Sequence, residues 1–156
     1  MSPAEGGREA GALRVVVLAD DLIWATRLVG QLRTIGADPV RVGSADAFAV
    51  ALADRPTSAD AAAGRAGNAV VDLTARSYDG LAAVRSAVAA GFHVLCVGQH
   101  DDHEERRAAR AAGAAQVLAY RKLFENGHAV LAAWLGLPAP AAGSLGMPAT
   151  PEVGAR

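Results

Sequence analysis

The sequence predicts a three-layer α/β sandwich, in which a parallel five-stranded sheet lies between two layers of helices. Residues 14–19, 68–72 and 93–97 are nearly all apolar, as expected of parallel strands that helices cover on both faces. Between these runs, apolar residues recur every three or four positions, which is typical of amphipathic helices. Strands that alternate with helices in this way require right-handed crossovers and a parallel sheet.

The first half of the chain contains the first two strand–helix units. After the strand at residues 14–19, a helix is expected from about residue 22 to residue 35, and Gly36 can cap its C-terminus. A short strand at residues 38–42 follows, and Ser44 can cap a helix that extends to about residue 55. Residues 56–67 are rich in Ala, Asp and Gly and are expected to form a loop or a frayed helix end.

The second half repeats the alternation three more times. The expected elements are, in order, a strand at 68–72, a helix from 81 to 91, a strand at 93–97, a helix from about 101 to 112, a strand at 116–120 and a helix at 123–135. Asp102 and Glu105 have the spacing of a capping box. We therefore expect residues 13–135 to form one domain, residues 1–12 to be disordered, and residues 136–156, which are rich in Pro, Ala and Gly, to form a flexible tail.

Composition excludes several classes of protein. The formal net charge is −1 and 4% of residues are aromatic, so neither a basic stripe nor a base-stacking platform for nucleic acid is expected. No signal peptide is recognisable, and no apolar stretch approaches the ~18 residues that span a bilayer. The single cysteine, Cys96, lies in an apolar run and fits a buried thiol in a reducing compartment. We expect a cytoplasmic protein.

Two strand orders are compatible with this alternation, namely the flavodoxin-like order 2-1-3-4-5 and half of a Rossmann-type sheet. A dinucleotide site requires G-x-G-x-x-G after the first strand, but residues 19–24 read A-D-D-L-I-W. This acidic loop would also repel the phosphate of a flavin. The flavodoxin-like order is therefore predicted.

Acidic residues follow two of the predicted strands. Asp20 and Asp21 come after the first strand and Asp72 ends the third, and the carboxyl ends of parallel strands are where open α/β sheets place their chemistry. The structural alternatives stay open. Asp72 could cap the turn after its strand, Asp20 and Asp21 could be helix N-caps, and Asp79 could cap the helix after the Asp79-Gly80 turn.

Residues 13–135 resemble the CheY-like receiver domains of two-component response regulators. The resemblance is carried by Asp20 with Asp21, by Asp72, by Asp79-Gly80, and by Ala112-Gly113-Ala114 before the last strand. It implies that Asp72 is the phosphoacceptor and that Asp20 is the second of two metal-binding acids, with Ala19 at the position of the first. If the alignment is shifted by one residue, Asp20 and Asp21 together take the places of the two metal-binding acids. Mg²⁺ is the expected ion if phosphorylation is retained.

Three further positions depart from the family's pattern. Gly98 stands where the family has a switch hydroxyl, and Tyr120-Arg121 stands where it has Lys-Pro, with Lys122 two positions late. Ala75-Arg76 replaces a Met-Pro pair. The switch positions Gly98 and Tyr120 are thus degenerate, and the chain resembles an atypical receiver or pseudo-receiver.

Three functional hypotheses follow. The leading one is a stand-alone, non-enzymatic signalling module that binds a protein partner, or a second copy of itself, through residues 104–110 and 120–124. The second is a single-domain response regulator that accepts a phosphoryl group on Asp72 from a histidine kinase, with Asp20 and Asp21 holding the metal and Arg121 or Lys122 replacing the missing Lys. The third is a small flavodoxin-like enzyme or ligand-binding domain, although no nucleophile–base pair is visible.

Overall fold

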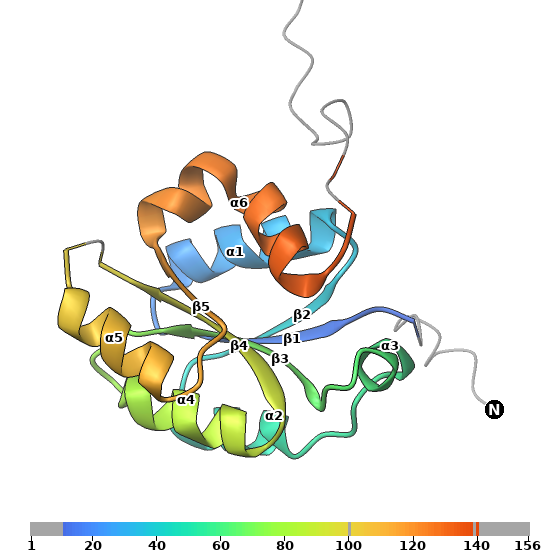
Figure 1. Ribbon diagram of the computed structural model, residues 1–156, viewed down its shortest axis with the longest axis horizontal. Helices are drawn as coiled ribbons and strands as arrows, with labels where there is room; N and C mark the ends of the chain where they lie inside the picture. Colours follow the sequence, from blue (N-terminus) through green and yellow to red (C-terminus); the bar gives the residue numbers. More distant parts are fainter. Residues whose placement is uncertain (1–10, 100, 139, 141–156) are drawn as a thin grey trace, which may run out of the picture.

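The computed structural model describes residues 11–99, 101–138 and 140. Most of the two terminal segments, which we expected to be disordered or flexible, therefore lies outside the described residues. The five strands form one parallel sheet in the order β2-β1-β3-β4-β5, which confirms the predicted flavodoxin-like topology (Figure 1). The strands are β1 (Arg14–Leu18), β2 (Asp38–Val42), β3 (Gly67–Asp72), β4 (Phe92–Gly98) and β5 (Gln116–Ala119). The helices are α1 (Leu22–Thr34), α2 (Ala45–Leu52), α3 (Ser58–Ala62), α4 (Gly80–Ala89), α5 (His103–Ala111) and α6 (Tyr120–Leu135).

Two helical layers cover the two faces of the sheet. Helices α1 and α6 lie on one face, and α2, α4 and α5 lie on the other (Figure 1). Side chains alternate between the faces along each strand. In β1, Val15 and Val17 join the core under α1 and α6, whereas Val16 and Leu18 join the core on the opposite face. Both cores are apolar, which explains why the strands are nearly continuous apolar runs.

The predicted caps are largely present. Gly36 adopts a φ of 89° after α1, and Ser44 accepts a hydrogen bond from the Ala47 amide at 3.2 Å. The Asp102 carboxylate accepts one from the Glu105 amide at 2.9 Å. The Glu105 carboxylate lies beside Gly98 rather than completing the predicted capping box.

Residues 56–67 correct the expectation of a loop or a frayed end, because they contain the separate helix α3. Thr57 and Asp60 form a capping box at its start, with the Thr57 amide donating to Asp60 Oδ2 at 3.1 Å. Asp60 is fully buried and also accepts a hydrogen bond from Asn68 of β3 at 2.9 Å. The Ala-rich composition concealed this helix, because its anchor is a polar contact with the sheet rather than an apolar stripe.

The end of the sheet also differs from the prediction. Strand β5 stops at Ala119 and α6 begins at once with Tyr120, whereas we expected the helix to begin at residue 123. The other boundaries agree with the prediction to within a few residues. Among the described helices, none has the length and apolar character needed to cross a membrane.

Candidate functional site

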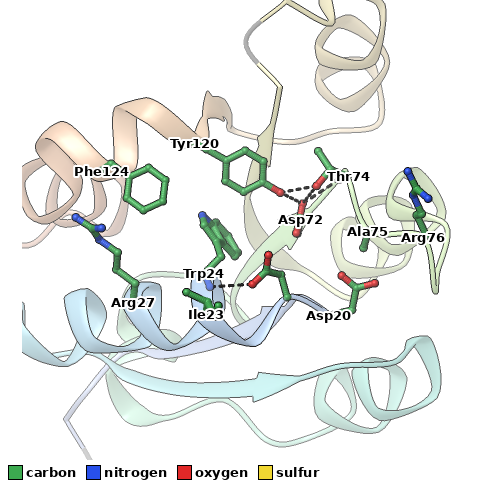
Figure 2. Close-up of a pocket in the computed structure, with 11 residues that line it drawn as sticks. Asp20, Ile23, Trp24, Arg27, Asp72, Thr74, Ala75, Arg76, Tyr120 and Phe124 are labelled. Carbon is green, nitrogen blue, oxygen red and sulfur yellow. Dashed lines mark hydrogen bonds between the residues drawn. The ribbon is translucent and has the colours of Figure 1, made fainter.

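Asp72 lies at the carboxyl end of the central strand β3, with β1 and β4 as its neighbours. Its side chain is buried, with 2% of the residue exposed. It lines a cavity of about 780 Å³ between the first turn of α1, the loop after β3 and the start of α6. The lining residues are Asp20, Asp21, Ile23, Trp24, Arg27, Asp72, Thr74, Ala75, Arg76, Tyr120 and Phe124 (Figure 2).

One oxygen of the Asp72 carboxylate receives three hydrogen bonds. The backbone amide and the hydroxyl of Thr74 donate to Oδ1 at 2.9 and 2.8 Å. The Tyr120 hydroxyl donates to the same oxygen. The turn-capping alternative for Asp72 is thus realised through the Thr74 amide, and the hydroxyl of Tyr120 is added from the other side (Figure 2).

The two hydroxyls also contact each other, since Thr74 Oγ1 and the Tyr120 oxygen are 2.5 Å apart. Each hydroxyl carries one hydrogen, so at most two of the three contacts among Thr74, Tyr120 and Asp72 can be hydrogen bonds at once. A carboxylate is the strongest acceptor of the three groups. Both hydrogens are therefore best placed on Asp72 Oδ1.

Tyr120 occupies a different place from the one expected of a tyrosine at the end of a strand. It is the first residue of α6, and its ring meets the Trp24 ring of α1 edge to face with centroids 5.1 Å apart. Burial raises the pKa of Tyr120, and the hydrogen bond to Asp72 raises it further. Tyr120 is therefore held as a neutral donor to a charged acceptor.

The protein contains two tyrosines, Tyr78 and Tyr120, and the pKa of each is raised above its ordinary value of about 10, in each case mainly by burial. Each tyrosine therefore binds its proton more tightly in the folded protein than in the unfolded chain. The resulting stabilisation of the fold is fully present below the pKa that the tyrosine has in the unfolded chain, and it is lost as the pH rises above that pKa. We expect the native protein to show almost no phenolate absorbance somewhat above pH 10, whereas the protein in denaturant titrates normally. A native tyrosine that titrates near its ordinary pKa would contradict the site geometry.

The two acids after β1 line the same cavity but have separate partners. Asp21 is the N-cap of α1 and accepts a hydrogen bond from the Trp24 amide at 3.0 Å. Asp20 is exposed and accepts one from the Ser77 hydroxyl at 3.0 Å. Within the described parts of the chain, no group of three or more His, Cys, Asp or Glu side chains is arranged to hold a metal ion.

Gly98 ends β4, at the position where the resemblance implies a hydroxyl. A Cβ atom at this glycine would lie 3.3 Å from Glu105 Oε2, so the Glu105 carboxylate occupies the space beside it. Burial raises the pKa of Glu105, and the negative charges of Asp102 and Asp72 raise it further. The Glu105 carboxylate of α5 thus lies beside the position at which the resemblance implies a hydroxyl.

The candidate replacements for the missing Lys do not reach Asp72. Arg121 pairs with Glu125 at 2.7 Å on the exposed side of α6, and Lys122 is exposed. The cations that line the cavity are Arg27 and Arg76. Arg27 lies over the Phe124 ring, 4.4 Å from its centroid, and within the described residues neither arginine forms an ion pair with the acids of the cavity.

Three residues of the site had not been singled out from the sequence. Thr74 binds Asp72 from two positions downstream, a spacing typical of turns after an aspartate. The buried Tyr78 hydroxyl bonds the backbone oxygens of Leu18 and Asp72 at 3.0 and 2.8 Å and so ties β1 to β3. For Glu105, the sequence indicated only a role in capping its helix. Asp79, by contrast, caps α4 as expected, with the Ala82 amide at 3.1 Å.

Comparison of the sequence with models of protein families and with curated proteins gives no match. Solved structures do match. A response regulator receiver protein from Burkholderia phymatum is 25% identical, with a TM-score of 0.62, over 83% of this chain and 99% of that chain. A two-component response regulator from Clostridium difficile is 13% identical, with a TM-score of 0.64, over 80% of this chain and 96% of that one. A response regulator from Burkholderia pseudomallei, solved with a phosphorylated aspartic acid, calcium ion and citrate, is 18% identical, with a TM-score of 0.61, over 85% of this chain and 68% of its own.

The chain has the fold of a response-regulator receiver domain. The resemblance inferred from the sequence is thereby confirmed for the fold. The carboxyl edge of the sheet carries Asp20, Asp21 and Asp72 around one cavity. At this edge, a tyrosine hydroxyl and a threonine hydroxyl contact the Asp72 carboxylate.

Proposed function

We propose that the chain is a signalling module of receiver fold that acts through contacts with other proteins, and that Asp72 has little phosphoacceptor activity. The observation that carries this proposal is the Tyr120 hydroxyl bound to the Asp72 carboxylate. An acceptor that is already hydrogen-bonded by two hydroxyls must lose part of that stabilisation before it can attack phosphorus.

The electrostatics of the cavity support the same proposal. Phosphoryl transfer depends on cations that neutralise the charge developing on the equatorial oxygens. In this site a neutral phenol stands at the position of the family's Lys, and Glu105 adds a carboxylate beside Gly98.

Exposed apolar side chains support a role in protein contacts. Leu22, Ile23 and Phe124 are 61%, 87% and 44% exposed, and they lie at the first turns of α1 and α6, where Ile23 and Phe124 line the mouth of the cavity. Clustered exposed apolar residues mark interaction surfaces. We therefore propose a partner surface at α1 and α6, in addition to residues 104–110 and 120–124, which the resemblance implies.

Incubation with acetyl phosphate and Mg²⁺, followed by intact-mass spectrometry, tests the proposal. We expect the wild-type protein to gain no more mass than Asp72→Asn, under conditions in which a receiver domain with the full set of site residues gains one phosphoryl group. A species heavier by one phosphoryl group in the wild type but absent from Asp72→Asn would defeat it.

One observation favours the second hypothesis, that Asp72 accepts a phosphoryl group from a histidine kinase. Each of the three hydrogen bonds that Asp72 receives goes to Oδ1, so Oδ2 is the atom that could take the phosphoryl group. If the mass experiment detects modification, this second function replaces the first. Tyr120→Phe should then accelerate it, since the carboxylate loses a competing donor.

A further inference from the structure

Helix α6 is interrupted close to its start. Asn126 has a φ of −146° and a ψ of 33°, so its backbone is not helical, although the residues on both sides are. The helix therefore consists of a first segment, residues 120–125, and a second segment, residues 127–135. We call residues 120–125 the latch segment.

A side chain from α1 occupies the interruption. In a continuous helix, the Leu123 carbonyl would accept a hydrogen bond from the amide four residues later. Here Gln31 Nε2 donates to it at 2.9 Å. Gly127 permits this approach, because a Cβ at that position would lie 2.3 Å from Gln31 Nε2. The interruption is thus a joint at which the Gln31 side chain of α1 binds a carbonyl of α6.

The latch segment contacts the rest of the domain through few side chains, one of which is Phe124, under the Arg27 guanidinium of α1 at 4.4 Å from the ring centroid. Its buried residue is Leu123, at 3% exposure, whereas Arg121, Lys122, Phe124 and Glu125 are exposed. At its first residue, Tyr120 contacts Asp72, Thr74 and the Trp24 ring (Figure 2). A short segment with little buried surface and a joint at its end is the kind of unit that opens separately from the rest of a domain.

We propose that the latch segment pivots at Asn126 and closes on Asp72 through the Tyr120 hydroxyl, so that the state of the Asp72 carboxylate sets the position of residues 120–125. The inference rests on the proposed function, for which it supplies the moving element. Gly98 has no side chain that could act as a switch, whereas Tyr120 bonds Asp72 directly. A change that removes the Tyr120 acceptor, or a partner that displaces the ring, would release the segment and move the exposed Phe124 with it.

Hydrogen exchange, read amide by amide on the unmodified protein, tests this proposal with two variants at opposite ends of the latch segment. Tyr120→Phe removes the contact with Asp72, and Gln31→Met removes the bond at the joint while keeping similar volume. We expect each to raise the exchange rates of residues 121–126 by about tenfold, as the loss of one hydrogen bond implies. The rates of residues 128–135 should not change.

Arg121→Ala is the matched control, because it breaks an exposed pair within the same segment and should leave the rates of residues 121–126 as they are. Equal acceleration of residues 121–126 and 128–135 would show that α6 opens as one unit and would overturn the proposal. So would unchanged rates in both variants. Because Asp72 is unmodified in this experiment, a positive result in the acetyl phosphate test would overturn the low phosphoacceptor activity without bearing on the latch.

Discussion

Replacing Asp60 by Ala should lower the free energy of unfolding by about 3–4 kcal/mol. The Asp60 carboxylate is fully buried and accepts hydrogen bonds from the Thr57 amide, the Thr57 hydroxyl and Asn68 Nδ2 at 3.1, 2.9 and 2.9 Å. Its removal takes away three hydrogen bonds to a charged acceptor and leaves one N–H of the buried Asn68 side chain without an acceptor, while the other N–H keeps the Arg14 carbonyl at 2.9 Å. Urea denaturation measures the loss.

Two further variants make the Asp60 result specific. Asp60→Asn keeps the volume of the side chain and one oxygen that can accept a hydrogen bond, so it should lower the free energy of unfolding clearly less than Asp60→Ala does. Asp46→Ala removes an exposed acid from the first turn of α2 and should have little effect. If Asp60→Ala were no more destabilising than Asp46→Ala, the buried network would not anchor α3 to the sheet.

Tyr120→Phe should lower the free energy of unfolding by about 1.5–3 kcal/mol, the range for a hydrogen bond to a charged group. The substitution keeps the ring that packs against Trp24 and removes only the hydroxyl that donates to Asp72. The buried carboxylate then retains the Thr74 hydroxyl and amide alone. Chemical denaturation near neutral pH, where the phenol is neutral, measures the change.

The control for Tyr120→Phe is Arg121→Ala, the exposed neighbour whose partner is Glu125, and it should leave stability almost unchanged. A Tyr120→Phe variant as stable as the wild type would mean that water replaces the phenol on Asp72 without loss. The site would then be as accessible to a phosphoryl donor as in an ordinary receiver.

The fold was predictable because its signals are local and repeated. The apolar strands β1, β3 and β4 and the cap residues Gly36 and Ser44 lie where the pattern indicated. The missing G-x-G-x-x-G was enough to choose the sheet order, which the topology confirms. Of the helices in the described part of the chain, α3 was the one not predicted, because a buried contact between Asp60 and Asn68 stabilises it. Contacts between elements leave no periodicity in a sequence.

The sequence predicted where the site lies, but not which of its side chains bind one another. The ends of the strands brought Asp20, Asp21 and Asp72 to one cavity, as expected. Whether Tyr120 would reach Asp72 depended on where β5 ends and α6 begins, and that boundary was predicted three residues late. Glu105 and Gln31 act through long side chains that cross between elements, and no spacing along the chain encodes such contacts.

A double-mutant cycle between Tyr120 and Asp72 tests the central claim most directly. The variants are Tyr120→Phe, Asp72→Ala and the double substitution, compared with the wild type by urea denaturation. If the phenol donates to the carboxylate as the structure shows, the double variant should lose less free energy of unfolding than the sum of the two single variants, by a coupling energy of about 1–2 kcal/mol. A cycle with Asp72→Asn in place of Asp72→Ala should show a smaller coupling energy, because the Asn side chain keeps an acceptor oxygen for the phenol. Losses that add to within about 0.5 kcal/mol would contradict the claim that Tyr120 holds Asp72.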